Sequence, residues 1–390
     1  MPIKTSFVPL RANSPYAPIR YEASRPYCGT LGTTGAQLLV QPGGIADYTR
    51  VVSKIVQDKF ASMTHAYSHE CKEIELKQLR SFGIFNICGR QIYDLDKVLV
   101  GALERTDIDL VPCGSLTLPS KSFYIHFGSG HEGCEAYEGA YILKDDTESL
   151  VFIQLISSGA FKNKQFWHYT PEAETPILML DTEDAGRSLL AAFDQSMDDA
   201  YEMHLQISRQ FDPMYRKSAT YQGRVDLSLE RLHFAKTSGQ TRQALQLIVT
   251  SILYVMSAPE DVQDDWQSSM PSDVFASVSR AQSFNAKLRA ERAVREQGYI
   301  KVRHVGRLFA SSAQGVSFGQ EAASGGGIKS THIRNGHMRR QHFGRENSQV
   351  KLIWIHPVVV NEGLTPMQGR IHAYEAPDPV ALPVARPGGC

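Results

Sequence analysis

The residues best suited to chemistry are concentrated in one segment near the C-terminal end of the chain, residues 328–345, here called the basic arm. The basic arm carries arginine, lysine and histidine side chains but no carboxylate, although the whole chain has a formal net charge of zero. These side chains are Lys329, His332, Arg334, His337, Arg339, Arg340, His342 and Arg345. A local excess of cations of this kind indicates an anionic partner.

Three interpretations of the basic arm are open. As a phosphate-binding surface it needs arginine and lysine side chains near one another, with Phe343 available to stack on a base. As a site for metal-independent cleavage of RNA it needs titrating groups and a cation, which His332 or His337 could form with Arg334. As a structural feature it is a solvated basic loop. The sequence favours binding, because nothing in it ties an acid–base pair to a fixed scaffold.

Other motifs give little support for enzymatic chemistry. His126, His131 and Cys134 are of the types that bind zinc, but no fourth ligand is evident, and we interpret the segment as a glycine-rich loop between strands. Cys88, Cys113 and Cys134 are interpreted as small buried residues. The chain contains no phosphate-binding loop, nucleophile elbow or HExxH motif. We therefore predict no catalytic residue, no metal and no cofactor.

The arm must be positioned by the elements around it, and the segment that follows it predicts a strand. Residues 350–360 read as a nearly continuous run of Val, Ile, Leu and Trp, which is typical of a strand covered on both faces. Trp354 is expected in the core, as is Tyr254 in its own apolar run. The strand would fix the basic arm to the body of the protein and could join a central sheet.

Apolar spacing predicts several helices in the rest of the chain. The expected helices cover residues 51–63, 74–82, 98–102, 182–203, 228–234 and 241–256. The last of these is apolar on nearly every side and is expected to be the central, fully buried helix. Asp94 and Asp96 are both interpreted as helix N-terminal caps, and Thr182 with Asp184 is expected to open the helix that follows.

Short segments rich in Tyr, Ile, Val and Phe predict a small, mostly antiparallel sheet. The expected strands are residues 122–127, 139–143, 149–156, 165–169 and 176–180, with an edge strand at 299–309. Residues 144–147 form the turn of a hairpin. Together with the helices, these strands predict an α+β fold with a helical N-terminal part.

Composition divides the chain into five parts. These are an irregular N-terminal arm (1–46), an α+β core (47–310), a flexible Gly/Ser linker (311–330), the basic motif with its core strand (331–363) and a Pro-rich tail (364–390). The cysteines contain no CxxC pair, and no signal peptide is evident at the N-terminus. The longest apolar run, 244–258, is too short to span a bilayer. We expect a cytoplasmic protein with no membrane partner.

The order and spacing of several residues resemble the type V-A anti-CRISPR family that lowers the level of the effector nuclease messenger RNA. The resemblance is strongest at His332, Arg334, Gly336, His337, Gly344, Trp354, Pro357 and Asn361. Upstream, it continues through Phe82-Gly83, Ile92–Asp96, Leu118-Pro119, Phe123–Ile125, Leu253-Tyr254 and Ala258–Asp261. The similarity therefore covers roughly residues 79–363.

The resemblance implies a counter-defence protein that recognises the N-terminal segment of the nuclease during its translation and causes loss of the message. Such a protein needs one surface for the nascent polypeptide and another for RNA, the ribosome or a host nuclease. We assign the second role to His332, Arg334, His337, Arg339, Arg340, His342 and Arg345. We interpret Gly336, Gly344, Trp354 and Pro357 as the structural anchor of the motif.

Two alternatives remain open. The chain departs from the family pattern at Asn335 and Met338, so a plasmid or phage accessory protein with the same scaffold could bind a different peptide or RNA. The other alternative is a metal-independent ribonuclease that uses the histidines of the basic arm.

Overall fold

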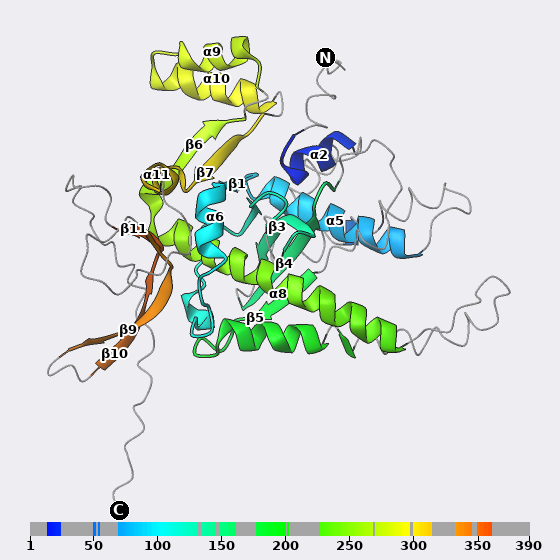
Figure 1. The fold of residues 1–390 in the computed structure, drawn as a ribbon. Coiled ribbons are helices and arrows are strands. Elements are labelled where there is room, and N and C mark those ends of the chain that lie inside the picture. Colours follow the sequence, from blue (N-terminus) through cyan, green and yellow to red (C-terminus); the bar gives the residue numbers. More distant parts are fainter. Residues whose placement is uncertain are drawn as a thin grey trace, which may run out of the picture.

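The computed structural model shows an α+β fold, as the sequence predicts, with a seven-stranded mixed sheet and two small two-stranded sheets (Figure 1). It describes residues 14–24, 50–51, 54, 69–131, 134–145, 149–160, 177–199, 201–202, 227–267, 270–296, 299–313, 332–344 and 349–360. No helix in this part of the chain is long and apolar enough to cross a membrane.

The large sheet has the strand order β5-β4-β3-β2-β1-β7-β6. Its strands are β1 (Ile92–Leu95), β2 (Ser122–His126), β3 (Tyr137–Lys144), β4 (Leu150–Ser157), β5 (Ile177–Asp181), β6 (Val262–Trp266) and β7 (Lys301–Val305). Strand β1 is parallel to β2 and β7, and the other neighbours are antiparallel. The expected hairpin is confirmed as β3 and β4, whose near-continuous burial reflects helices on both faces.

Helices lie on both faces of the sheet (Figure 1). They are α2 (Ala17–Ser24), α5 (His69–Ile87), α6 (Lys97–Leu103), α8 (Leu227–Ser257), α9 (Ser272–Ser279), α10 (Phe284–Glu296) and α11 (Arg307–Ser312), with 3-10 turns η2 (Cys113–Ser115) and η4 (Pro259–Asp261). A further helical segment covers residues 189–199. It begins after the expected start at Thr182, because the side chains of Asp181 and Asp184 bond backbone N–H groups in a turn there.

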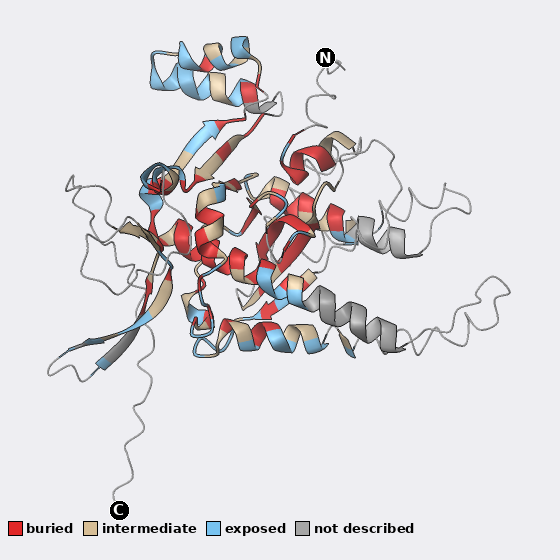
Figure 2. Cartoon of the chain, viewed as in Figure 1, coloured by how far each residue is buried: buried red, intermediate tan, exposed pale blue. Residues whose placement is uncertain are grey.

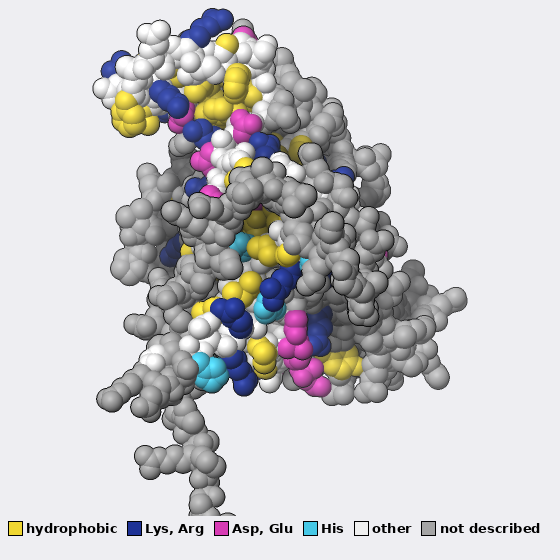
Figure 3. All heavy atoms as spheres, turned by 60° about the vertical axis from the view of Figure 1, so that its left-hand side comes forward, with side chains coloured by type: hydrophobic (Ala, Val, Ile, Leu, Met, Phe, Trp, Pro, Cys, Tyr) yellow, Lys and Arg dark blue, Asp and Glu magenta, His cyan; other side chains and the backbone are white. Residues whose placement is uncertain are grey.

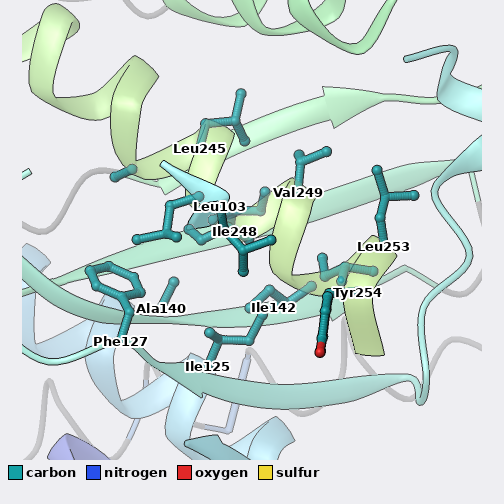
Figure 4. Close-up of a cluster of buried hydrophobic side chains, with 14 of the residues drawn as sticks. Leu103, Ile125, Phe127, Ala140, Ile142, Leu245, Ile248, Val249, Leu253 and Tyr254 are labelled. Atoms are coloured by element: carbon teal, nitrogen blue, oxygen red, sulfur yellow. The ribbon is translucent and has the colours of Figure 1, made fainter. Parts of the chain in front are cut away.

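Helix α8 forms the core on one face of the sheet. Leu245, Ile248, Val249 and Leu253 are buried and lie over β2 and β3 (Figure 4). The expected core helix is therefore confirmed, although one continuous helix replaces the two pieces predicted at 228–234 and 241–256. Buried residues concentrate in the sheet and in the part of α8 that crosses it (Figure 2).

The opposite face of the sheet is covered by α2 and α5, where Tyr21, Phe82 and Phe85 pack together. For residues 17–24, helix α2 corrects the expectation of an irregular N-terminal segment. Its Arg20 is fully buried, pairs with Glu138 of β3 and donates from Nε to a backbone carbonyl at 2.9 Å. A buried cation needs such partners, and meeting them fixes the helix on the sheet.

Strand β7 is not the edge strand that the sequence predicts, because β6 pairs with its outer side. The strand also ends earlier, at Val305. There Gly306 adopts a φ of +90°, and a Cβ on it would lie 2.6 Å from the Leu99 side chain. Glycine adopts this positive φ without strain and has no Cβ to clash with Leu99, so the chain can turn directly into α11.

Several expectations fall outside the residues that the structure describes. They are the strand at 165–169, most of the helix at 51–63, nearly all of the linker at 311–330 and the tail at 364–390.

Candidate functional site

The described residues of the basic arm, 332–344, form strands instead of a loop. Strands β8 (His332–Arg334) and β9 (His337–Phe343) are followed by β10 (Gln349–Ile355) and β11 (Val358–Val360). The predicted single strand at 350–360 is interrupted at Pro357, which has no N–H to donate. It also does not join the central sheet: β10 pairs with β9 and β11 pairs with β8.

We call β9 and β10 the basic hairpin. Antiparallel pairing places Arg340 opposite Leu352 and Arg339 opposite Ile353. Because successive side chains of a strand point to opposite faces, the exposed side chains of Arg339 and Arg340 lie on different faces of the hairpin. The hairpin thus carries cations on both faces. Strand pairing fixes their positions, whereas a solvated loop would not.

One end of the basic hairpin is anchored in the core. Trp354 is 3% exposed and lies opposite Met338, which packs against the main core cluster. A Cβ on Gly336 would lie 3.1 Å from the Trp354 ring, so the lack of a side chain there permits close packing. The rings of His356 and Tyr254 of α8 form a T-shaped pair with centroids 5.8 Å apart. The core expectations for Trp354 and Tyr254 are confirmed.

A buried carboxylate links this anchor to the large sheet. Asp261 is 3% exposed, and its Oδ2 accepts a hydrogen bond from the Tyr254 hydroxyl at 2.8 Å. The same carboxylate accepts from the backbone N–H groups of Leu308 (2.7 Å) and Phe309 (3.2 Å) at the start of α11. Burial and the nearby Asp261 raise the pKa of Tyr254 well above its ordinary value, so its hydroxyl stays a donor. These contacts give a physical role to the Tyr254 and Asp261 motif.

The predicted site residues differ in their exposure and in the face of the hairpin on which they lie. Arg334, Arg339, Arg340 and His342 are exposed, whereas His332 and His337 are half-buried. Arg345 lies outside the described residues. His337 and His342 occupy positions of opposite parity on β9 and so face opposite sides of the hairpin. This arrangement gives no convergent histidine pair on β9 for RNA cleavage.

A polar cluster that the sequence analysis missed lies where the parallel strands end. Asp94 does not cap a helix: it lies in β1, in register with His126 of β2 and His304 of β7. Its Oδ2 accepts a hydrogen bond from the Tyr16 hydroxyl at 3.0 Å and lies 3.0 Å from His304 Nδ1. The cap of α6 is Asp96, as expected, which accepts from Val98 N–H. No local signal connects residues so distant in sequence.

Burial dominates the electrostatics of His126, lowering its pKa to about 4; Arg20 and His131 also lower it, while Asp94 opposes the change. His131 Nε2 contacts the Phe127 carbonyl at 2.5 Å. Within the described ranges, no group of three or more His, Cys, Asp or Glu side chains is arranged to hold a metal ion.

Burial raises the pKa of two cysteines in the described core. Cys113 and Cys134 are buried, as expected, and burial raises their pKa values to about 11 and about 12. Cys88 is half-buried, which corrects its predicted burial.

The fold and site define an α+β protein in which a basic β-hairpin is anchored in the main core cluster, next to helix α8. Residues 93–362 match the family described as "AcrVA2-like: Anti-CRISPR type V subtype A2 family", and the chain belongs to this family. The match spans more than half of the chain and confirms the resemblance to type V-A anti-CRISPR proteins.

The chain is also similar to a solved structure. The crystal structure of AcrVA2 aligns with 82% of this chain and 96% of its own, at 12% identity and a TM-score of 0.34. No curated protein matches the chain.

Proposed function

We propose that this protein is an anti-CRISPR factor that reads the N-terminal segment of a type V-A effector nuclease during translation and causes loss of its message. Membership of the anti-CRISPR family supports the counter-defence role. In this proposal a nascent polypeptide is the specific partner, and the basic hairpin contacts RNA, either free or within the ribosome.

The observation that carries the RNA contact is the placement of exposed cations on both faces of an anchored hairpin. Arg340 and His342 share one face, and Arg339 lies on the other. A two-stranded ribbon with cations on both sides can contact phosphates from either face. Because backbone phosphates carry no base identity, this contact would add affinity without sequence preference.

Specificity in this proposal comes from the peptide, and recoding the target tests it. Synonymous changes in the early codons of the nuclease should leave message loss intact, whereas amino-acid changes encoded there should abolish it. The measurement is the level of nuclease message with and without this protein. If synonymous recoding removes the effect and amino-acid changes do not, the protein does not read the peptide.

The matched control separates peptide reading from RNA contact. The Arg339→Ala, Arg340→Ala variant should bind the nascent peptide as the wild type does but lower the message less. A variant that loses peptide binding as well would place peptide recognition on the hairpin itself.

A further inference from the structure

Strand β6 is an edge of the large sheet, and its outer side pairs with no strand in the described part of the chain. Gly306 N–H bonds the Asp261 carbonyl across β7 and β6, and this bonded pair fixes which backbone groups of β6 face β7. Because bonded and non-bonded pairs alternate in an antiparallel ladder, Val262, Asp264 and Trp266 direct their N–H and C=O groups outward. The edge therefore presents backbone groups to a partner.

Some of these outward groups already have partners. Val262 N–H donates to the Pro259 carbonyl. Trp266 N–H donates to Asp265 Oδ1 at 2.8 Å. Among the described residues, none accepts from Asp264 N–H, and none donates to the carbonyls of Val262, Asp264 and Trp266. An added strand can therefore donate to these carbonyls and accept from Asp264.

The opposite edge of the sheet, β5, differs in this respect. The outward Met179 N–H donates to Ser196 Oγ of the helical segment 189–199 at 3.2 Å. The outward Asp181 carbonyl accepts from Cys113 Sγ at 3.8 Å. Both contacts use groups that an added strand would need, so β6 is the more open edge.

Two adjacent carboxylates set the chemistry of the β6 edge. Asp264 is 53% exposed, with its Oδ1 3.5 Å from Arg303 Nε, and Asp265 is also exposed. Because successive side chains of a strand alternate, the two carboxylates project from opposite faces of β6. Strand β6 is pale blue over much of its length in Figure 2, and Figure 3 shows acidic side chains just below α9 and α10. A strand added here should carry cations.

We propose that the β6 edge is the docking site of the nascent polypeptide, which adds to the sheet as an extended strand with adjacent basic residues. Strand addition at a sheet edge takes affinity from backbone hydrogen bonds and specificity from side chains. Two consecutive cationic residues of the peptide lie opposite Asp264 and Asp265, and an uncharged residue lies opposite Val262. The identity of the peptide rests on the proposed function, whereas the chemistry of the edge does not.

The charges of the edge disfavour other occupants. A second copy that paired edge to edge would bring the same aspartates together, and like charges across a strand pair are destabilising. RNA phosphates are repelled by the same carboxylates. Charged side chains also protect an edge from unselective pairing, and a cationic strand is the partner that they admit.

Fluorescence anisotropy with two labelled peptides tests the proposal on the full chain. One peptide has the N-terminal sequence of the type V-A nuclease. The other is a designed extended peptide of threonine and valine with an adjacent lysine and arginine at its centre. Both should bind, and more weakly as salt is added. A version of the designed peptide with glutamates in place of the two cations should not bind.

Amide hydrogen exchange locates the bound peptide without any substitution. Residues 262–266 should become protected when either peptide binds, because the Asp264 N–H gains an acceptor. If only the designed peptide binds and protects β6, the chemistry of the edge is right and the proposed target is wrong. If neither peptide binds, or binding leaves β6 unprotected, the docking site is wrong.

Substitutions at Asp264 separate the backbone contacts from the charge. Asp264→Pro removes an N–H that β7 does not use, so the sheet keeps its pairing while the nuclease peptide should bind about tenfold more weakly or worse. Asp264→Asn keeps the N–H and removes the charge, which should weaken binding by about two- to fivefold and flatten its salt dependence. Asp273→Asn is the matched control, because Asp273 is exposed on α9 outside the edge, and it should bind as the wild type does.

The level of nuclease message distinguishes failure of this inference from failure of the proposed function. Asp264→Pro should abolish message loss and Asp273→Asn should retain it. If a folded Asp264→Pro variant, with the melting temperature of the wild type, still binds the peptide and lowers the message, the peptide is read elsewhere and the β6 inference is overturned while the proposed function stands. If the proline variant does not fold, the exchange protection of wild-type β6 decides.

Discussion

The two ends of the basic hairpin have opposite environments although only a few residues separate them. At one end Trp354 and Met338 pack on the core, while towards the turn Arg340 and His342 are exposed. The buried end shows why the hairpin has one position, and the exposed end shows what it can present to a partner. Stability and binding should therefore be separable by substitution within one hairpin.

The largest effect is expected at the buried end. Trp354→Ala should lower the free energy of unfolding by roughly 3 to 5 kcal/mol, because it removes a large core side chain and leaves a cavity. Denaturant unfolding measures the change. Arg340→Ala is the control on the paired strand, and an equal loss there would contradict the distinction between the two ends.

A pH titration tests the contribution of the buried His126 to stability. The pKa of His126 falls to about 4 in the folded protein from about 6.5 in the unfolded chain. Between these values the unfolded chain binds a proton that the folded protein does not, so stability decreases as the pH falls from about 6.5 to 4, by roughly 3 kcal/mol in total. Thermal unfolding of wild type and His126→Gln across this range should show a smaller pH dependence in the variant. An unchanged dependence would remove His126 as its source.

The Asp261 link should have an intermediate effect. Asp261→Ala leaves the buried Tyr254 hydroxyl and the first N–H groups of α11 without their acceptor, which should cost about 1 to 3 kcal/mol. Asp264→Ala is the control, because this neighbouring carboxylate is 53% exposed, and it should change stability by no more than about 0.5 kcal/mol. If chemical denaturation gives the same loss of stability for both variants, the hydrogen bonds of Asp261 do not stabilise the fold.

The sequence predicted the core better than the site, for physical reasons. Long apolar runs predicted α8, β3 and β4, because burial on both faces leaves a strong compositional signal. Strand β6 was missed because its two exposed aspartates, Asp264 and Asp265, break the apolar alternation. The basic arm was recognised by charge, but its strands were not, since their pairing depends on residues beyond the turn.

Asp94 illustrates the same limit. Asp94 and Asp96 both precede α6, and the sequence offers no way to see that only Asp96 reaches a helix N–H. The pairing of Asp94 with His304 depends on the register of β1 and β7, which are far apart in the chain. Register across a parallel pair is a tertiary property and has no local signature.

The smallest effect on stability is expected at the exposed end. Arg339→Ala with Arg340→Ala should change the free energy of unfolding by no more than about 0.5 kcal/mol per site, because both side chains are solvated. Thermal unfolding checks this. If the double variant unfolds, the two arginines are required for the stability of the fold.

The salt dependence of RNA binding tests the central claim most directly. RNA affinity of the wild type should fall as salt rises, and the double alanine variant should bind more weakly with a shallower slope, by on the order of 0.7 to 0.9 per lost phosphate contact. Arg339→Lys with Arg340→Lys, which keeps both charges, should retain most of the wild-type slope. If the double alanine variant keeps the affinity and salt slope of the wild type, the basic hairpin does not bind RNA through these arginines.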